Sequence, residues 1–178
     1  MRRAMAAVLA TMVLGPIQAL CQGRPLVEIG TGAGLTILSD GGTITAFGVP
    51  GAGIISQPAI YASFFTPSGL VIEPSAAVNV VHVSGSTTST VGLSGMVGKL
   101  FHGAVMNSTF AGVVGSLQGV SGGGTNFAVG GRVGYRCVLS GGGLAMRVEG
   151  GYRRWLRFGG GNEFSIGVGF GGIIHSSK

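Results

Sequence analysis

The sequence is short of charge, and of negative charge most of all. Charged residues make up 9% of its 178 residues, with five acidic side chains against eleven basic ones. Soluble domains carry about a quarter charged residues, which help to cover the surface that meets water. This chain is 46% apolar and has a mean hydropathy of +0.56. We therefore expect that something other than water solvates much of its outside.

Cysteine is also scarce, with one residue at Cys21 and one at Cys137. The first closes an N-terminal segment with a basic start, a short apolar stretch, a Gly-Pro break and small residues, which is the layout of a secretory signal peptide. We predict cleavage after Cys21, so that 1–21 is the signal peptide and 22–178 is one mature domain. Lipid attachment at Cys21 is the alternative, and the leucine before it argues against this. The remaining Cys137 has no internal disulfide partner and is expected to pack as a small apolar group.

Long apolar runs are missing after that segment. No stretch approaches the roughly 20 uninterrupted apolar residues of a spanning helix, because glycine, serine or arginine breaks each candidate. No segment shows a helical stripe either. The arginines after that segment mostly stand singly along apolar alternation and form no run or basic patch, so we do not expect nucleic-acid binding.

The chain instead alternates with period two, and eight segments read as strands. The turns between them are rich in glycine, and only the first connection is long, which predicts an all-β, up-and-down antiparallel meander. That first connection leaves room for a short strand extension. The predicted strands are 24–38, 58–65, 70–83, 89–101, 108–120, 126–139, 144–157 and 163–174.

The two faces of these strands differ in bulk. In the last strand Phe164, Ile166 and Val168 share one face, while serine and glycine occupy the other. If the bulky face were the core of a soluble protein, the exterior would consist mostly of glycine, serine and alanine, which prevent association poorly. If the bulky face meets lipid, the sheet must close, because a bilayer tolerates no open sheet edge. Eight strands suffice for a transmembrane β-barrel whose interior is nearly filled by side chains.

This direction brings the sparse charges together inside. Glu28 is a further candidate, although its neighbours do not determine its face. Buried charges must pair, because an unpaired one costs several kcal/mol, which favours a structural plug. The alternative is a narrow pore, which four arginines against one to three carboxylates would make favourable to anions. The predicted luminal charge network is Glu73, Arg132, Arg136, Arg147, Glu149 and Arg153.

Aromatic residues are expected where the outer face crosses from lipid to water. Phe127 and Tyr135 lie eight positions apart on one face, which is roughly 20 Å along the membrane normal for a tilted strand. That spacing is close to the height of an apolar band flanked by aromatic girdles. The predicted girdle is Phe127, Tyr135, Tyr152, Trp155, Phe158 and Phe164.

The start of the chain, the eight alternating segments, "GGRVGYRCVL", "LAMRVEGGYRRWL" and "EFSIGVGFGGII" together resemble the small outer-membrane β-barrels of the OmpA/OmpX type. The resemblance covers nearly the whole mature chain. It implies a Gram-negative outer membrane, contact with its lipid, and handling by periplasmic chaperones and the barrel-assembly machinery. Those barrels usually end in an aromatic residue, whereas this sequence runs on to "HSSK", and we expect no appended peptidoglycan-binding domain. With both termini in the periplasm, the loops that face outward are 39–57, 84–88, 121–125 and 158–162.

We expect a non-enzymatic structural or surface-interaction role, with a narrow anion channel or a secreted lipocalin-like carrier as alternatives. "GVSGG" around Ser121 matches the spelling of a nucleophile elbow, but the strand-to-helix context is missing. The three histidines show no metal-ligand spacing, so no catalytic, cofactor or metal residue is predicted. The remaining enzymatic alternative is lipid editing by Ser108 or Ser121 with His82 or His102.

Overall fold

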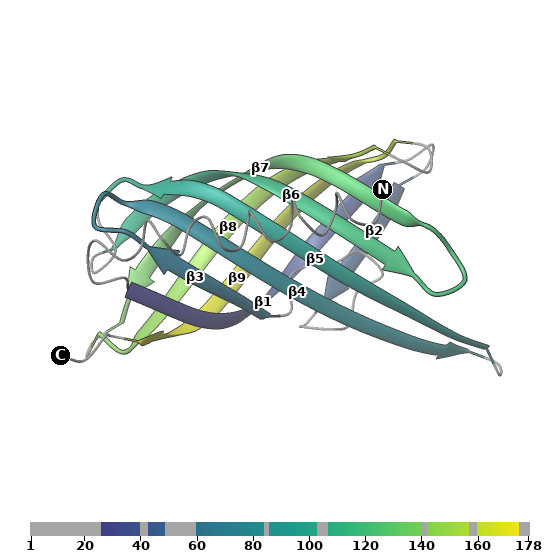
Figure 1. Cartoon of the computed structure of the whole chain (residues 1–178), viewed down its shortest axis with the longest axis horizontal. Coiled ribbons are helices and arrows are strands. Elements are labelled where there is room, and N and C mark those ends of the chain that lie inside the picture. The colour runs from purple at the N-terminus through teal and green to yellow at the C-terminus, as the bar shows by residue number, and fades with distance from the viewer. Residues whose placement is uncertain are drawn as a thin grey trace, which may run out of the picture.

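The computed structural model describes residues 26–39, 43–48, 60–83, 86–102, 107–139, 142–156 and 160–174. The signal peptide expected at 1–21 lies outside this part. Among the described residues, no helix is long and apolar enough to cross a membrane. The strands are β1 (Leu26–Ser39), β2 (Thr43–Gly48), β3 (Ile60–Phe65), β4 (Leu70–Val83), β5 (Ser86–Leu100), β6 (Ser108–Val120), β7 (Thr125–Val138), β8 (Leu144–Trp155) and β9 (Asn162–Ile174) (Figure 1).

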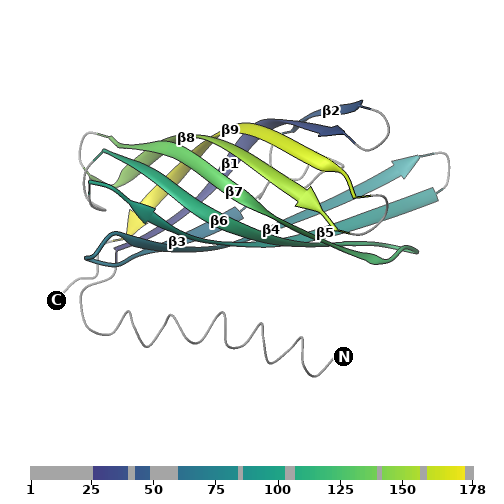
Figure 2. The same ribbon diagram turned by 90° about the horizontal axis from the view of Figure 1, so that it is seen from above.

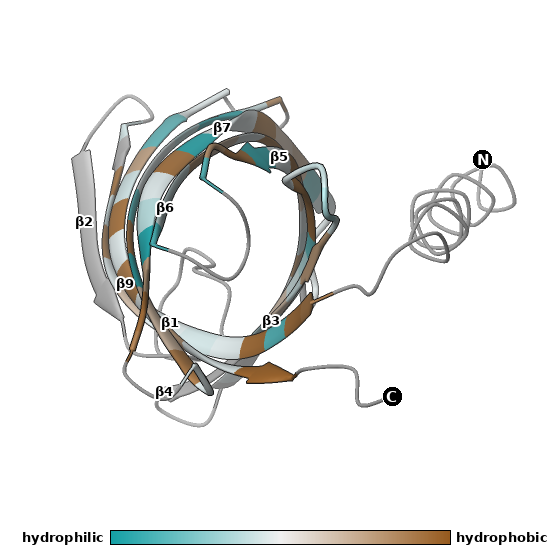
Figure 3. Ribbon diagram, turned by 90° about the vertical axis from the view of Figure 1, so that its left-hand side faces the viewer, coloured by the Kyte–Doolittle hydropathy of each residue, from teal (hydrophilic) through white to brown (hydrophobic). Residues whose placement is uncertain are grey.

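The sheet closes on itself. Strands β3 to β9 follow one another as antiparallel neighbours, and β1 lies between β3 and β9. The closing ladder between β1 and β9 runs from Val27 opposite Ile174 to Ser39 opposite Asn162. Figure 3 shows the resulting ring end-on. The chain is an eight-stranded antiparallel barrel, as predicted, with β2 as an additional short strand.

Each of the eight predicted segments corresponds to one barrel strand, and none of the observed ends is more than three residues from its predicted position. The segments 70–83 and 108–120 have the predicted bounds. The extra strand β2 comes from the long first connection. It pairs with the second half of β1, from Gly34 to Ser39, whereas β3 pairs with the first half, from Leu26 to Gly30. The two short strands β3 and β2 therefore lie one after the other along the same edge of β1.

The barrel has two different ends. We call the end at which β1 begins and β9 ends the terminal end, and the opposite one the loop end. At the loop end β4 and β5 continue as a two-stranded ribbon to the pair Val83 and Ser86. Figures 1 and 2 show this ribbon reaching beyond the other strands.

The bulky alternate side chains point outward. Val113 is 70% exposed and Val133 is 59% exposed, while Glu28 and Glu73 on the opposite face are each 1% exposed. Figure 3 shows the alternating hydropathy along the strands. A soluble carrier would need its apolar face inside, so this direction is incompatible with the lipocalin-like alternative.

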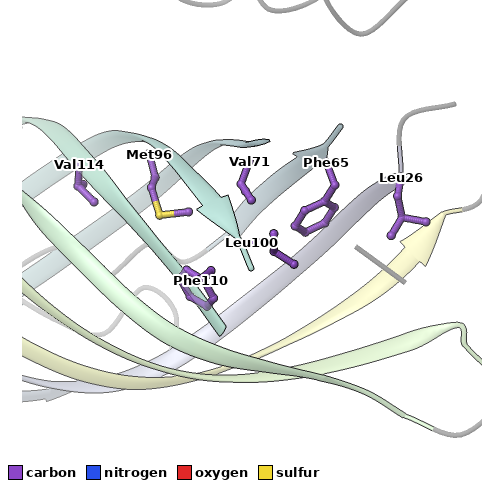
Figure 4. Close-up of a cluster of buried hydrophobic side chains, with 7 residues drawn as sticks. All are labelled: Leu26, Phe65, Val71, Met96, Leu100, Phe110 and Val114. Carbon is purple, nitrogen blue, oxygen red and sulfur yellow. The ribbon is translucent and has the colours of Figure 1, made fainter. Parts of the chain in front are cut away.

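The lumen at the terminal end is apolar, which the sequence analysis did not anticipate. The alternation along the strands predicts only small and charged side chains in the interior. Seven buried side chains form this layer (Figure 4), and Ile173 packs against them. The layer lies beside the charged site, where Phe65 contacts the guanidinium of Arg136. Its members are Leu26, Phe65, Val71, Met96, Leu100, Phe110 and Val114.

Candidate functional site

The chain has four glutamates, and all four lie in the lumen together with four arginines. None of these eight side chains is more than 12% exposed. The six residues of the predicted network are all among them. Glu73, Arg132, Arg147 and Glu149 contact one another, whereas Arg136 pairs with Glu28 and Arg153 pairs with Glu163. The network consists of Glu28, Glu73, Arg132, Arg136, Arg147, Glu149, Arg153 and Glu163.

Glu73 on β4 is the hub of the network. Its Oε1 accepts a hydrogen bond of 2.5 Å from Arg132 Nη2, and its Oε2 accepts one of 2.5 Å from Arg147 Nη1. Ser63 Oγ donates to the same Oε2 at 2.5 Å. In the ring, β4 stands four positions from β8 in either direction. Through Arg147, the hub therefore connects opposite walls of the barrel.

Glu149 completes a cycle of alternating charge. Its Oε1 lies 3.2 Å from Arg132 Nη1, and its Oε2 lies 3.2 Å from Arg147 Nε. The second contact is an ion pair without hydrogen-bond geometry. Arg132 also places its Nη2 3.3 Å from Met96 Sδ, at the edge of the apolar layer. Arg132 and Arg147 therefore each contact the same two carboxylates, those of Glu73 and Glu149.

A second pair lies next to the apolar layer. Arg136 Nε donates to Glu28 Oε2 at 2.6 Å, and Tyr61 Oη donates to Glu28 Oε1 at 3.0 Å. The guanidinium of Arg147 stacks 3.5 Å above the centre of the Tyr61 ring, which adds cation–π attraction. The face of Glu28, which its sequence neighbours left open, is therefore the inner one.

Glycine on the inner face makes room for these long side chains. A Cβ built on Gly169 would lie 2.8 Å from Arg147 Nε, and one on Gly171 would lie 2.6 Å from Glu28 Cγ. Any larger residue at these two positions would force a charged side chain to move. The small face predicted from the sequence is therefore what allows the ion pairs to fit inside an eight-stranded ring.

The third group lies toward the loop end and contains a carboxylate that the sequence analysis missed. Glu163 forms an ion pair with Arg153 and accepts a 3.0 Å hydrogen bond from Arg153 Nε. Arg153 Nη1 also donates to Ser116 Oγ at 3.0 Å. The signal was available, because Glu163 alternates with outward Phe164 and shares the face of Ser165.

Trp155 was predicted in the outer aromatic girdle, and this is wrong. It is 4% exposed, and its Nε1 donates to Glu163 Oε2 at 2.9 Å inside the lumen. Trp155 lies three residues after Tyr152 but two residues after Arg153. It therefore shares the inward face of Arg153. Proximity in the sequence was a poor guide where the two faces alternate.

The other girdle residues that the structure describes lie on the outer face. Phe127, Tyr135, Tyr152 and Phe164 are 39 to 55% exposed, and Phe158 lies outside the described residues. The rings of Tyr152 and Phe164 stand 5.0 Å apart. These two lie toward the loop end, whereas Tyr135 lies toward the terminal end, opposite Thr109.

The charges in the described lumen balance, four carboxylates against four guanidinium groups. The expectation of one to three carboxylates against four arginines was therefore wrong, and with it the reason for an anion-favouring pore. Because the luminal charges cancel, the whole formal net charge of +6 belongs to residues outside the lumen network. Chemically, the network joins the walls and fills the space between them.

The two serines considered for lipid editing bond to the backbone. Ser108 Oγ accepts a 3.0 Å hydrogen bond from the backbone N–H of His102, and Ser121 Oγ accepts one of 2.8 Å from the N–H of Ser89. In the described part of the chain, no hydrogen bond joins either hydroxyl to an imidazole. The side chain of His82 lies outside that part.

No protein-family model and no curated protein matches the sequence. Among solved structures, the neisserial surface protein NspA superposes with a TM-score of 0.52 at 15% identity, over 82% of this chain and 95% of that one. Ail, the attachment invasion locus protein of Yersinia pestis, gives 0.48 at 12% identity over 85% and 100%, and its complex with the heparin analogue sucrose octasulfate gives 0.45 at 9% over the same shares. The chain has the fold of a small eight-stranded barrel. At these identities the likeness concerns the fold, and at that level the expectation from the sequence is confirmed.

Proposed function

We propose that the chain is an integral outer-membrane barrel with a structural or surface-interaction role and no catalytic activity. The observation that carries this proposal is the outer face of the barrel. Among the described residues, twenty-four large apolar side chains are at least 37% exposed, whereas none of the four glutamates is more than 12% exposed. Leaving so much apolar surface in water costs about 25 cal/mol for each Å². This cost disappears when lipid acyl chains, and not water, cover the outer face.

The backbone supports the same proposal. A tilted strand needs about 9 to 11 residues to cross the apolar part of a bilayer, and the six consecutive strands β4 to β9 have 12 to 15. Ring closure supplies hydrogen-bond partners for the backbone, which an apolar medium requires. Outward aromatic side chains toward both ends suit the two boundaries of such a band.

The interaction surface lies at the loop end in this proposal. The ribbon of β4 and β5 projects there, past the closed part of the ring. With both termini in the periplasm, this ribbon and the first connection reach the cell exterior. The lumen contributes rigidity, since two of its three groups of ion pairs connect strands that are not neighbours in the ring, Glu73 with Arg147 and Glu28 with Arg136. The proposed partners are outer-membrane lipid and, during biogenesis, periplasmic chaperones and the assembly machinery.

The test is expression of the full chain in a Gram-negative host. We expect mature protein in the outer-membrane fraction, with Gln22 as its first residue, and a shift in migration between unboiled and boiled samples. Soluble periplasmic protein without such a shift would refute the proposal. Recording from purified protein in planar bilayers addresses the channel alternative, because the filled, neutral lumen predicts no unitary conductance steps.

A further inference from the structure

A polar cluster interrupts the apolar outer face toward the loop end of β8 and β9. Asn162 Oδ1 accepts a 2.8 Å hydrogen bond from Tyr152 Oη and one of 3.2 Å from Arg154 Nη1. Arg154 stands directly opposite Asn162 in the ladder, and Tyr152 stands opposite Phe164. The cluster therefore spans two strands and is held by its own hydrogen bonds.

Arg154 differs sharply from the arginine before it. Arg153 points inward and is neutralised by Glu163. Arg154 points outward and is exposed, and its hydrogen bond in the described structure goes to a neutral amide. All four glutamates of the chain are committed inside the lumen. An arginine has five N–H donors, so the outer guanidinium keeps donors available for an external anion.

The cluster borders the apolar band. Phe164 and Ile166, the next outward residues along β9, are 55% and 58% exposed. The ring of Phe164 lies 5.0 Å from that of Tyr152. If the band is embedded in acyl chains, the guanidinium lies at the level of the headgroups. Tyrosine suits such a boundary because its ring is apolar and its hydroxyl is polar.

We propose that Tyr152, Arg154 and Asn162 form a binding site for the phosphate of an anionic lipid. The planar guanidinium matches phosphate oxygens in a bidentate manner, and Asn162 restricts its orientation. The lipid's acyl chains lie over Phe164 and Ile166, and this contact distinguishes a lipid from free phosphate. The site rests on the proposed membrane function, and it adds a lipid class that the barrel prefers.

The chain offers a matched control. Lys99 on β5 is also an exposed cation, but it lies near the terminal end of its strand, opposite Ala111 and Leu70. It has no tyrosine or asparagine partner among the described contacts. A general attraction of positive charge to anionic bilayers would involve both residues, whereas a built site involves Arg154 alone.

The experiment is native mass spectrometry of the full-length mature chain, released from nanodiscs of equal parts phosphatidylglycerol and phosphatidylcholine. We expect the retained lipid to favour phosphatidylglycerol, and Arg154→Gln to lower that preference about fivefold, since one cation near an anionic surface contributes about 1 kcal/mol. Tyr152→Phe should lower it about twofold, because it removes one tether of Asn162 while Arg154 remains. Lys99→Gln should leave it unchanged.

The outcomes are distinguishable because insertion is measured first, by heat-modifiable migration of each variant. A wild-type chain that does not insert refutes the membrane proposal, and the lipid site with it. Inserted protein with no lipid preference, or an equal loss in Lys99→Gln, overturns the lipid site alone. Displacement of the lipid by millimolar inorganic phosphate would also overturn it, because the site would then recognise the anion without its chains.

Discussion

The two faces of β8 carry opposite chemistry, although they alternate residue by residue. The inner face presents Arg147, Glu149 and Arg153, each paired with opposite charge, while the outer face presents Leu144 and Val148 at 59% and 45% exposure. A charged side chain is stable on the inner face because counter-charges reach it from its own strand, from an adjacent strand or from across the lumen. An apolar side chain on the outer face is favoured when its surroundings are apolar, as they are in the proposed membrane location. The difference shows that a residue's place in the inward–outward alternation decides whether it faces the lumen or the exterior. The overall composition of the strand does not decide this.

The largest expected effect comes from breaking the inner face at its hub. Glu73→Gln removes the carboxylate that accepts from both Arg132 and Arg147. Loss of one partner from a buried ion pair costs about 3 to 5 kcal/mol, because a charge is left uncompensated. We expect a loss of this size in the free energy of unfolding, measured by urea titration of the refolded barrel.

A double-mutant cycle isolates that interaction from a general loss of packing. Glu73→Gln combined with Arg132→Gln removes one acid and one base from the cycle, so it should destabilise the barrel by less than the sum of the two single changes. Additive effects would mean that the two residues do not depend on each other, contrary to their 2.5 Å contact.

Putting a charge on the outer face is the next largest perturbation. Val148→Arg places a cation in the apolar band, which costs about 2 to 4 kcal/mol near the middle of a bilayer. We expect slower and less complete insertion into phosphatidylcholine vesicles, scored by unboiled gel migration. Val148→Leu is the matched control and should insert normally. Equal insertion of the arginine variant would contradict the assignment of this face to lipid.

Trp155 tests which face an aromatic residue occupies. It is the only tryptophan in the chain, so its fluorescence reports on this position alone. Because the ring lies inside and donates to Glu163, we expect little quenching by lipids brominated in their acyl chains. Trp155→Phe should cost about 1.5 to 3 kcal/mol, the range for a hydrogen bond to a charged group. Strong quenching would place the ring among the lipids, as the sequence alone had suggested.

The strands and their direction could be predicted because the period of two is a local pattern. The inward direction of Glu163 follows from the same local pattern, because it alternates with outward Phe164. Glu28 is different, since it lies between Val27 and Ile29 and only ring closure brings Arg136 and Tyr61 to it. The partners within the network could not be predicted, because they depend on which residues of distant strands reach the same height in the lumen. The inward turn of Phe65 and Phe110 at the terminal end depends on that closure as well.

The smallest expected effect is that of salt on the free energy of unfolding. Salt should affect the charges of the outer face and those of the inner face differently. Exposed charges are screened over about 8 to 10 Å at ordinary ionic strength, whereas buried pairs are screened much less. Raising sodium chloride from about 50 to 500 mM should therefore change the free energy of unfolding by less than about 1 kcal/mol, while the lipid preference that depends on Arg154 should fall. Both quantities can be measured on the same nanodisc samples. A large loss of stability with salt would mean that water and ions reach the lumen, and a filled interior would then be the wrong description.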